Sequence, residues 1–303
     1  MNQFIKNTLF FSAPVLLFIV IMEIFLRNIP NDYSYKKNYL DHNSNQIETL
    51  FLGSSHALYA VNPEFIHGNS FNAAHVAQSL DYDLEILKKY EKQMNKLKYL
   101  VIPIDYFSLY NRLETGVEHW RIKNYNIYYG LNRSQNLVDN LEILNGKWSE
   151  NIRRLLQFLI QSKSVIGCNQ FGWGKRNSED TKDLISTARA AAQRHAKKDK
   201  SFFKENVAIV HEIIALAKVK NVEVIFYTSP AYKTYTSLLN KEQLQITIAT
   251  TKKMVSLNSH VQYYNFLNDT SFTAIDFYDA DHLNAIGAKK FSKKMDGIIK
   301  SLK

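Results

Sequence analysis

Two serines follow the first predicted strand of the chain, at a place where a serine hydroxyl can react. The sequence Gly-Ser-Ser-His occupies residues 53–56, directly after residues 47–52, which we predict to form a buried strand. A serine at a strand-to-helix turn presents its hydroxyl to solvent, and the neighbouring glycine permits the tight backbone. Ser55 is therefore a candidate nucleophile. The competing interpretation is that Ser54 or Ser55 caps the following helix.

A second reactive segment, Asp-Ala-Asp-His-Leu-Asn-Ala-Ile-Gly, occupies residues 279–287. Asp279 and His282 are three positions apart, so both side chains lie on one turn of the chain. The carboxylate can then accept a hydrogen bond from one imidazole nitrogen, while the other nitrogen takes a proton from a nucleophile. The alternatives are a polar cap of the last helix or a metal site. A metal site is poorly supported, because no third ligand lies nearby at metal-binding spacing.

Together the two segments resemble the SGNH (GDSL) hydrolase superfamily. In that family a Gly-Asp-Ser block follows the first strand, and an Asp-x-x-His block, often continuing as His-x-Asn-x-x-Gly, precedes the last helix. Residues 53–55 and 279–287 occupy these places in the same order. The resemblance covers residues 47–303, although the middle third matches poorly. It implies Ser55 as nucleophile, His282 as general base and Asp279 as the acid that orients it, with no metal or other cofactor. The implied fold is a flavodoxin-like three-layer α/β/α sandwich.

The oxyanion hole departs from the family pattern. The family's second block is Asn-x-Gly-x-x-Gly, whereas this chain has Asn-Ala-Ala-His-Val-Ala at residues 72–77, with Ala74 at the first glycine position. The resemblance implies backbone N–H donors from Ser55 and Ala74. The family's third block brings in an Asn after the third strand, where this chain has Asp105. A carboxylate there repels an oxyanion unless it is protonated or turned away.

The other histidines are interpreted as structural. His56 follows Ser55 directly, and its ring is expected to point away from the Ser55 hydroxyl. Asp281 is expected to form local hydrogen bonds and is left outside the triad. Three further histidines are typical of satisfied surface or core positions: His67, His75 and His119.

The order of the elements predicts an α/β fold. Besides 47–52, we predict strands at 70–72, 99–104, 222–228 and 262–266, and helices at 81–97, 203–218, 241–257 and 284–302. Strands that alternate with helices favour a parallel sheet covered on both faces. In such sheets the functional residues gather at the carboxyl ends of the strands.

The N-terminal segment is apolar enough to cross a membrane. Residues 7–26 carry a single charge, Glu23, and would span about 30 Å as a helix, the thickness of a bilayer core. We favour an uncleaved signal anchor at residues 1–27 over a cleaved signal peptide, because residues 22–33 contain no small-x-small cleavage pattern. Basic residues on both sides leave the orientation open. Residues 28–46 are polar and turn-rich, and are interpreted as a juxtamembrane linker.

Residues 105–205 are predicted to form an insertion, because they separate two strands by far more than an ordinary connection. Helices are expected at 137–161 and 181–198. Aromatic residues are concentrated at 106–129; they form the core of the insertion, which we favour, or stack on sugar rings as a cap over the site. The Gly-Trp-Gly sequence at 172–174 is a candidate for a loop that reaches the site.

Composition narrows the classes of function. The 303 residues are 46 % apolar with one cysteine, which excludes collagen, low-complexity disorder and a disulfide scaffold. The 38 basic and 28 acidic residues give a net charge of +10. Without residues 1–27 these counts become 36 and 27, so the soluble part keeps +9. Beside a membrane anchor, this charge favours contact with anionic lipid or a polyanionic glycan over nucleic acid.

The anchor and the Gly-Ser-Ser block make the chain similar to family members that modify cell-surface polysaccharides. That resemblance implies an extracytoplasmic serine esterase or O-acyltransferase, with acetyl as the expected acyl group and a polytopic membrane acyltransferase as donor partner. The alternative is a non-catalytic accessory protein of a glycan acylation or export complex, which the altered glycine block motivates. A nucleic-acid binder ranks third.

Overall fold

The computed structural model describes residues 2–144, 148–161, 164–177, 180–197 and 199–302. The chain divides into two compact units, of which the first comprises residues 1–37 and 117–167 and the second comprises residues 38–116 and 168–303. The second unit contains the main sheet and the three residues predicted to form the triad.

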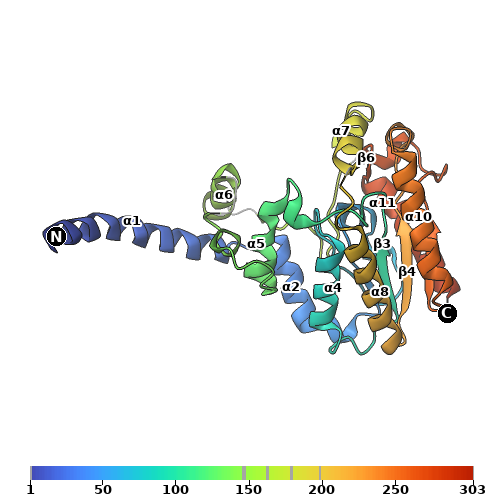
Figure 1. Ribbon diagram of the computed structural model, residues 1–303, viewed down its shortest axis with the longest axis horizontal. Helices are drawn as coiled ribbons and strands as arrows, with labels where there is room; N and C mark the ends of the chain where they lie inside the picture. The colour runs from blue at the N-terminus through green and yellow to red at the C-terminus, as the bar shows by residue number, and fades with distance from the viewer. Residues whose placement is uncertain (1, 145–147, 162–163, 178–179, 198, 303) are drawn as a thin grey trace. The chain divides into compact units, whose positions relative to one another are not determined.

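The second unit is built on a five-stranded parallel sheet with strand order β2-β1-β3-β4-β5. Figure 1 shows β3 beside β4 in this sheet. The strands are β1 (Thr49–Phe51), β2 (Ser70–Asn72), β3 (Tyr99–Pro103), β4 (Glu223–Thr228) and β5 (Val261–Asn265). Every predicted strand is present, with boundaries that differ by at most two residues. This strand order is that of flavodoxin-like folds, so the predicted fold class is confirmed.

Helices cover both faces of the sheet. On one face lie α3 (Ser55–Ala60) and α11 (Ala285–Ser301); on the other lie α4 (Leu80–Tyr90) and α8 (Phe203–Val219). The remaining helices of this unit include α7 (Ser186–His195), α9 (Lys233–Thr236) and α10 (Lys241–Ser256). The helices predicted at 203–218, 241–257 and 284–302 are confirmed. The helix predicted at 81–97 ends at Tyr90, because the chain turns between that residue and β3.

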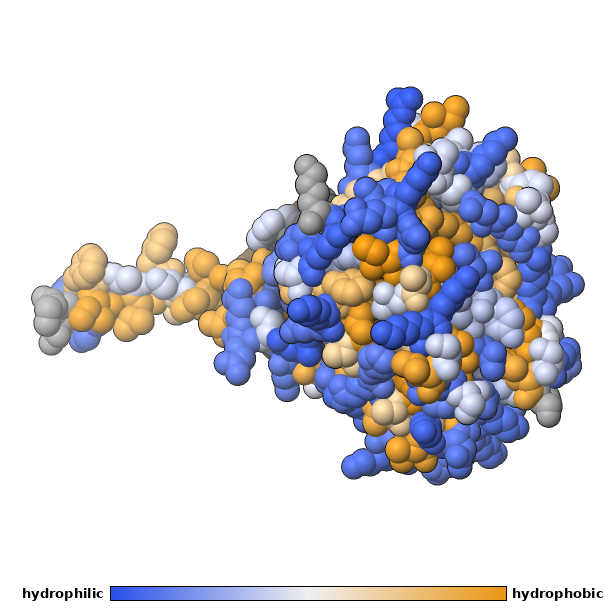
Figure 2. All heavy atoms as spheres, turned by 45° about the vertical axis from the view of Figure 1, so that its right-hand side comes forward, coloured by the Kyte–Doolittle hydropathy of each residue, from blue (hydrophilic) through white to orange (hydrophobic). Residues whose placement is uncertain are grey.

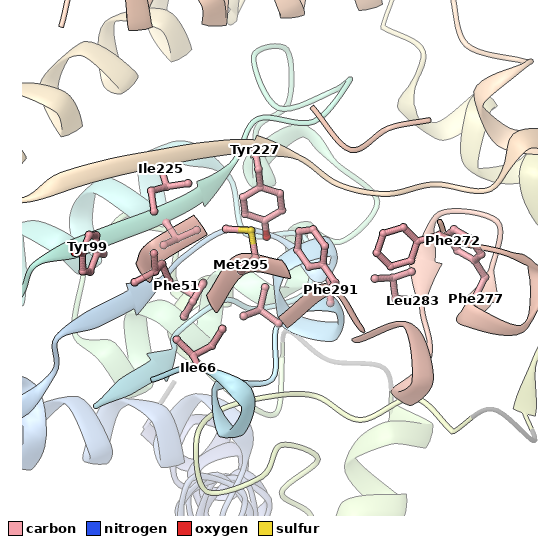
Figure 3. Close-up of a cluster of buried hydrophobic side chains, with 14 residues drawn as sticks. Phe51, Ile66, Tyr99, Ile225, Tyr227, Phe272, Phe277, Leu283, Phe291 and Met295 are labelled. Carbon is pink, nitrogen blue, oxygen red and sulfur yellow. The ribbon is translucent and has the colours of Figure 1, made fainter. Parts of the chain in front are cut away.

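The core between the sheet and α11 explains why the sequences of the strands are continuous apolar runs. Figure 3 shows Phe291 and Met295 of α11 beside Tyr227 of β4, and all three are fully buried. Side chains alternate along a strand, so Val224 and Phe226 point to the opposite face, where they are also fully buried. A sheet buried on both faces needs apolar residues at every position.

The strand order places a topological switch point between β1 and β3. From β1 the chain passes to β2 on one side, and β3 then lies on the other side of β1. In open parallel sheets this reversal leaves a crevice at the carboxyl ends of the strands, where ligands bind. Ser55 follows β1 and Asp105 follows β3, so both candidate residues lie at this crevice.

The first unit begins with α1 (Asn2–Asn28), which is long and apolar enough to cross a membrane and exposes most of its side chains (Figure 2). The end of α1 is different, because Leu26 and Ile29, the residue that follows the helix, are buried in a cluster with Ile143. The Glu23 carboxylate also accepts the backbone N–H groups of Glu142 and Ile143, at 3.0 and 2.9 Å. The end of α1 is therefore part of a folded unit.

Residues 28–46, which were predicted to be a turn-rich juxtamembrane linker, contain a helix instead. Residues 32–43 form helix α2 (Asp32–Asn43). Leu40 is fully buried, and the ring of Tyr39 stacks on Phe71 of β2 with centroids 3.9 Å apart. The composition of this segment is polar, but these side chains pack into the fold and stabilise a helix that turn-forming residues alone do not predict.

The predicted insertion is also corrected. Residues 117–167 belong to the first unit, and residues 168–205 belong to the second. Among the described residues of the helix expected at 137–161, a short 3₁₀ turn spans Leu137–Asn140, and α6 (Trp148–Leu155) is continued by a π-helical turn at Leu156–Ile160. Residues 145–147 lie outside the described residues. The helix expected at 181–198 is shorter, as α7.

The aromatic side chains at 106–129 are mainly core residues, as favoured from the sequence. The interior of the second unit contains Tyr106, Phe107 and Tyr110, while Tyr125 and Tyr129 are fully buried in the first unit. Buried rings are not available to stack on sugars, so the alternative of a sugar-binding cap is wrong for these five residues.

Candidate active site

The three predicted residues meet in one chain of hydrogen bonds. The Oγ of Ser55 lies 2.8 Å from Nε2 of His282. The Nδ1 of the same imidazole lies 2.9 and 3.1 Å from the two carboxylate oxygens of Asp279. The His282 and Asp279 side chains are 13 % and 16 % exposed, so the arrangement is sheltered yet open to solvent. This is the geometry in which a serine hydroxyl can pass its proton to a histidine oriented by a carboxylate.

The turn before α3 separates the roles of the two serines. Ser54 is the N-cap of α3, and its hydroxyl oxygen accepts the N–H of His56 at 3.4 Å. Ser55 is the first helical residue, so its N–H has no intrahelical carbonyl partner and its hydroxyl is free to face His282. The capping alternative therefore applies to Ser54.

Gly53 makes this turn possible. Its φ is +117°, a conformation that side chains with a Cβ rarely adopt. A Cβ there would also come within 2.6 Å of the Pro103 ring on β3. The Gly53 N–H is held by the buried carboxylate of Asp83 at 2.8 Å.

The loop before α11 fixes Asp279 and His282. They lie in a small antiparallel pair formed by β6 (Phe277–Asp279) and β7 (His282–Leu283), whose register shift brings the two residues opposite each other. Asn284 caps α11, with its side-chain oxygen accepting the N–H groups of Ile286 and Gly287. The Asn284 amide also donates to the carbonyls on either side of Asp276, at 2.7 and 3.2 Å. This Asn therefore ties the histidine loop to the helix.

The predicted oxyanion donor Ala74 does not fit that role. Its backbone N–H donates to the side-chain oxygen of Asn72 at 3.0 Å. Asn72 in turn donates to the carbonyls of Ala57 and Val61, at 2.9 and 2.8 Å, and so closes the C-terminal end of α3. The Ala74 N–H is part of this clamp, and an oxyanion would have to displace Asn72 to use it. The Ser55 N–H remains as a candidate donor.

The Asp105 carboxylate is turned toward other partners. The repulsion of an oxyanion that was expected from a carboxylate after β3 is therefore avoided. One of the Asp105 oxygens lies 2.8 Å from Nδ1 of His56, and the other accepts the N–H of Ser229 at 2.7 Å. The second nitrogen of His56 lies 3.4 Å from Asp281. His56 thus bridges two buried carboxylates, and its ring points away from Ser55 as predicted.

The bridge between Asp105 and Asp281 holds His56 as a cation. Burial alone would lower its pKa, but the charge of Asp105 and the hydrogen bonds to both carboxylates raise the pKa of His56 to about 10. Burial alone would likewise raise the pKa of Asp281, but the charge of His282 and the hydrogen bond from His56 hold that pKa well below its usual range. A buried ion pair with two carboxylates therefore lies directly beside the triad.

Sequence reasoning missed how far this network extends. Asp281 also lies 3.4 Å from Arg194 and 3.9 Å from His195, both on α7. The His195 ring is hydrogen-bonded to the hydroxyl of Tyr235 at 2.8 Å, and burial lowers the pKa of His195 well below its usual value. The packing of α7 positions Arg194 and His195 in this network. No spacing of residues in the sequence indicates that α7 packs there. The His56–Asp105 pair had a signal in the sequence, because both residues follow neighbouring parallel strands.

His56, Asp281 and His282 also form a group whose ligand atoms lie within 4.8 Å of one another, close enough for a metal ion. Both ring nitrogens of His56 already face carboxylates, with Nδ1 2.8 Å from Asp105 and Nε2 3.4 Å from Asp281. Both ring nitrogens of His282 are also engaged, one with Ser55 and one with Asp279. The contacts of these residues fit an ion-pair network better than a metal centre.

Three further features named from the sequence lie away from the triad. His67 is exposed and pairs with Asp296, and His119 lies 3.9 Å from Asp139. The 172–174 loop packs on the C-terminal half of α3, where the Trp173 indole donates to the Tyr59 carbonyl at 2.8 Å. That loop supports α3 from the end opposite to Ser55.

Searches against protein-family models and against curated proteins found no match. Among solved structures, the fold is similar to a Bacteroides fragilis protein provisionally described as an acylhydrolase. The TM-score is 0.41 and the identity 11 %, over 88 % of this chain and 96 % of that one. A Streptococcus pneumonia protein, provisionally described as a platelet activating factor, has a TM-score of 0.45 at 10 % identity, over 95 % and 97 % of the two chains. A GDSL-like lipase from Bacteroides thetaiotaomicron has a TM-score of 0.41 at 11 % identity, over 89 % and 99 %. Likeness at these TM-scores carries no functional inference.

Proposed function

We propose that this protein performs serine-dependent acyl transfer or ester hydrolysis through an acyl-enzyme. The observation that carries the proposal is the continuous hydrogen-bonded chain from Ser55 through His282 to Asp279. Its three members come from opposite ends of the sequence, yet they meet at hydrogen-bonding distance where the sheet has its switch point.

In the first half of the reaction, Ser55 Oγ attacks the carbonyl carbon of an ester while its proton passes to Nε2 of His282. Asp279 stabilises the resulting imidazolium at Nδ1 and does not itself take the proton. The carbon–oxygen bond of the ester then breaks, the leaving alkoxide takes the proton from Nε2, and the acyl group stays on Ser55. The Ser55 N–H at the start of α3 faces no intrahelical partner and can donate to the oxyanion.

In the second half, a water molecule or a sugar hydroxyl gives its proton to Nε2 of His282 and attacks the acyl carbon. The bond to Ser55 Oγ breaks, and the serine recovers the proton. Hydrolysis and transfer differ only in this acceptor, so the same triad serves both outcomes.

The proposed substrate is an extracytoplasmic polysaccharide carrying O-acyl groups, with acetyl as the acyl group and a polytopic membrane acyltransferase as donor partner for transfer. Two features support a glycan. The Tyr59 ring lies 5.5 Å from the His282 ring, and Arg176 is placed over the Tyr59 ring at 4.2 Å, so an aromatic and a cationic group border the triad. The net charge of the chain is +10, which favours a polyanionic polymer.

We also propose that α1 is a retained membrane anchor, with the second unit on the extracytoplasmic side. The support is the way α1 ends: Leu26 is 1 % exposed, and Glu23 caps two backbone N–H groups of the first unit. Cleavage at residues 22–33 would remove these contacts from a folded unit. The intact mass of the membrane-extracted protein tests this, because an anchor retains residues 1–27 and a cleaved signal peptide loses them.

The decisive experiment on the reaction compares the two adjacent serines in the full-length protein. Wild type and Ser54→Ala should react with a fluorophosphonate probe and hydrolyse an aryl acetate, because Ser54 only caps α3, at a cost of about 1 kcal/mol in stability. Ser55→Ala should lose both reactions by at least about a thousandfold. A wild-type protein that is neither labelled nor active, or equal labelling of the Ser55→Ala variant, overturns the proposal.

A second candidate is a non-catalytic accessory protein of a glycan acylation or export complex. The specific observation that favours it is the Ala74 N–H, which Asn72 occupies in place of an oxyanion. Loss of one such donor costs roughly 3 to 4 kcal/mol of transition-state stabilisation. Surface-glycan acylation in a strain carrying Ser55→Ala separates the two, since a non-catalytic role leaves acylation unchanged.

A further inference from the structure

Helix α6 and the π-helical turn that follows it present an unusual amount of apolar surface to solvent. Trp148, Ile152, Leu156 and Ile160 recur at every fourth position and are between 43 % and 72 % exposed. Leu159 adds to the same surface at 55 %. Side chains spaced in this way lie along one side of a helix. A contiguous apolar surface of this kind marks an interaction site rather than ordinary surface variation.

The other side of the same helix is polar. Arg153 pairs with Glu150 at 2.6 Å and donates to Gln157 at 3.4 Å. The segment is therefore amphipathic, with a Trp at one end of the apolar side and arginines beside it. This is the composition of helices that lie in the membrane–water interface, where Trp and Arg are favoured.

The inner contacts of this helix attach it to the end of α1, within the first unit. Arg154 donates to the Leu26 carbonyl at 3.2 Å and pairs with Glu142 at 2.9 Å. Leu155 packs against the cluster formed by Leu26, Ile29 and Ile143. The apolar side of the helix is left facing outward by this attachment.

The attachment lies at the level where the apolar surface of α1 ends. Ile24 and Phe25 of α1 are still 56 % and 49 % exposed, whereas Leu26 is buried. Glu23 and Arg27, the last charges of α1, are bound to the segment that leads into α6: Glu23 accepts N–H groups at 142–143, and Arg27 donates to the Asn140 carbonyl at 2.6 Å. A bilayer crossed by α1 therefore has its boundary beside α6.

We infer that the segment Trp148–Ile160 is an interfacial helix, which lies on the same phospholipid bilayer that α1 crosses and buries its apolar side among the acyl chains. This inference rests on the proposed anchoring by α1. A lipid surface is the occupant because α1 holds it next to this helix at all times, whereas another protein would have to arrive by diffusion. The helix gives the first unit a second membrane contact and limits rotation about the anchor.

Site-directed spin labelling of the full-length protein in phosphatidylcholine–phosphatidylglycerol vesicles tests this inference. Cys168, the one cysteine of the chain, is replaced by Ser, and single cysteines replace Leu16 in α1, Leu156 in the segment, or Val219 at the end of α8. All three residues are exposed apolar side chains, so labelling them leaves the core intact. The accessibility of each label to oxygen and to a water-soluble nickel chelate is then compared.

We expect the labels at 16 and 156 to be several-fold more accessible to oxygen than to nickel, and the label at 219 to show the reverse. If the label at 156 behaves like that at 219 while the label at 16 lies in lipid, the interfacial helix is refuted and the anchor stands. If the label at 16 also behaves like that at 219, the anchor is refuted with it. Dipolar broadening at position 156 would reveal a second copy of the chain on this surface and would likewise refute the lipid contact.

Discussion

Asp279 holds His282 at two points: one of its oxygens lies 2.9 Å from the ring Nδ1 and also accepts the backbone N–H of His282 at 2.9 Å. The carboxylate thereby fixes both the position of the backbone and the orientation of the ring. Because Nδ1 faces an acceptor, it must carry a proton, which leaves Nε2 as the nitrogen that faces Ser55 with its lone pair. The assignment of the base follows from this pair of contacts.

Asp279→Asn should therefore lower kcat with little effect on folding. The Asn side chain can keep the backbone contact, but its amide group no longer demands the Nδ1–H form of the ring, and it does not stabilise an imidazolium. We expect a loss on the order of 10³ to 10⁴ in kcat for aryl acetate hydrolysis, as in other triads that lose this carboxylate. Thermal unfolding within a few degrees of wild type is the control. Retention of more than a tenth of the activity would contradict the assigned role.

His56→Gln should destabilise the protein in a pH-dependent way. It leaves the carboxylates of Asp105 and Asp281 buried without their cation, which costs about 3 to 5 kcal/mol. The folded-state pKa of His56 is about 10, above its ordinary value of 6.5. Its stabilising effect is thus fully present below pH 6.5 and is lost as the pH rises toward 10. In urea unfolding, the difference in the free energy of unfolding between wild type and variant should become smaller as the pH rises from 6.5 to 10.

The matched control for that measurement is His67→Gln. His67 also pairs with a carboxylate, that of Asp296, but its side chain is 67 % exposed, so solvent screens the pair. Its substitution should change the free energy of unfolding by less than about 1 kcal/mol. A gap for His56→Gln that is as small as that for His67→Gln would show that the buried imidazolium is not a stabilising cation.

Asp83→Asn should stabilise the protein above neutral pH. Burial raises the pKa of Asp83 to about 7, against an ordinary value of 3.8, so the folded state holds a proton there that the unfolded state has released. The free energy of unfolding of wild type therefore falls as the pH rises from about 4 to about 7, by roughly 1.4 kcal/mol per pH unit. Asn keeps an oxygen to accept from Gly53 and Gln78 and has no charge to bury. Denaturant unfolding should show equal stability near pH 4 and a growing advantage of the variant up to pH 7.

Asp269→Asn provides a control of opposite sign. The hydrogen bond and charge of Lys294 hold the pKa of Asp269 below its ordinary value despite the opposing effect of burial. Its contribution to stability is present at neutral pH and is lost as the pH falls below about 4. Asp269→Asn should accordingly weaken the protein at pH 7. If both variants shift stability in the same direction, the buried position of Asp83 does not control its titration.

The sheet could be predicted from local signals, whereas the proximity of Ser55 and His282 was predicted from two distant motifs whose order resembles that of a known family. Short apolar runs bounded by turn residues marked every strand, and the order of strands and helices implied the parallel sheet. Ser55 and His282 stand at ends of such elements, where an exposed polar side chain has no packing role to explain it. The fold brings the two residues together, with Ser55 Oγ 2.8 Å from Nε2 of His282.

Features that depend on packing between distant segments could not be predicted. Residues 32–43 have a polar composition, and their helix is stabilised by Leu40 and by Tyr39 stacking on Phe71, which the local pattern does not reveal. The Ala74 N–H was assigned by motif position, but its direction is set by the Asn72 side chain. Two of the neighbours of Asp281, Arg194 and His195, come from α7, about 90 residues earlier in the chain, a placement that only tertiary packing decides.

The two glycines of α11 give the sharpest test of how the histidine loop is held. A Cβ on Gly287 would come within 2.2 Å of the Asp276 carbonyl oxygen and 2.9 Å of the Leu283 side chain, so Gly287→Ala must push α11 away from the loop that carries His282. A Cβ on Gly297, in the same helix, would meet nothing within 4 Å among the described residues.

Gly297→Ala should therefore stabilise the protein by about 0.5 to 1 kcal/mol through helix propensity, with unchanged kcat. Gly287→Ala should cost about 1 to 3 kcal/mol by overpacking and also lower kcat, because a shift of His282 lengthens its contact with Ser55. Urea unfolding and aryl acetate hydrolysis measured on both variants check this contrast, and equal kcat values would show that the loop holds His282 without the close approach at Gly287.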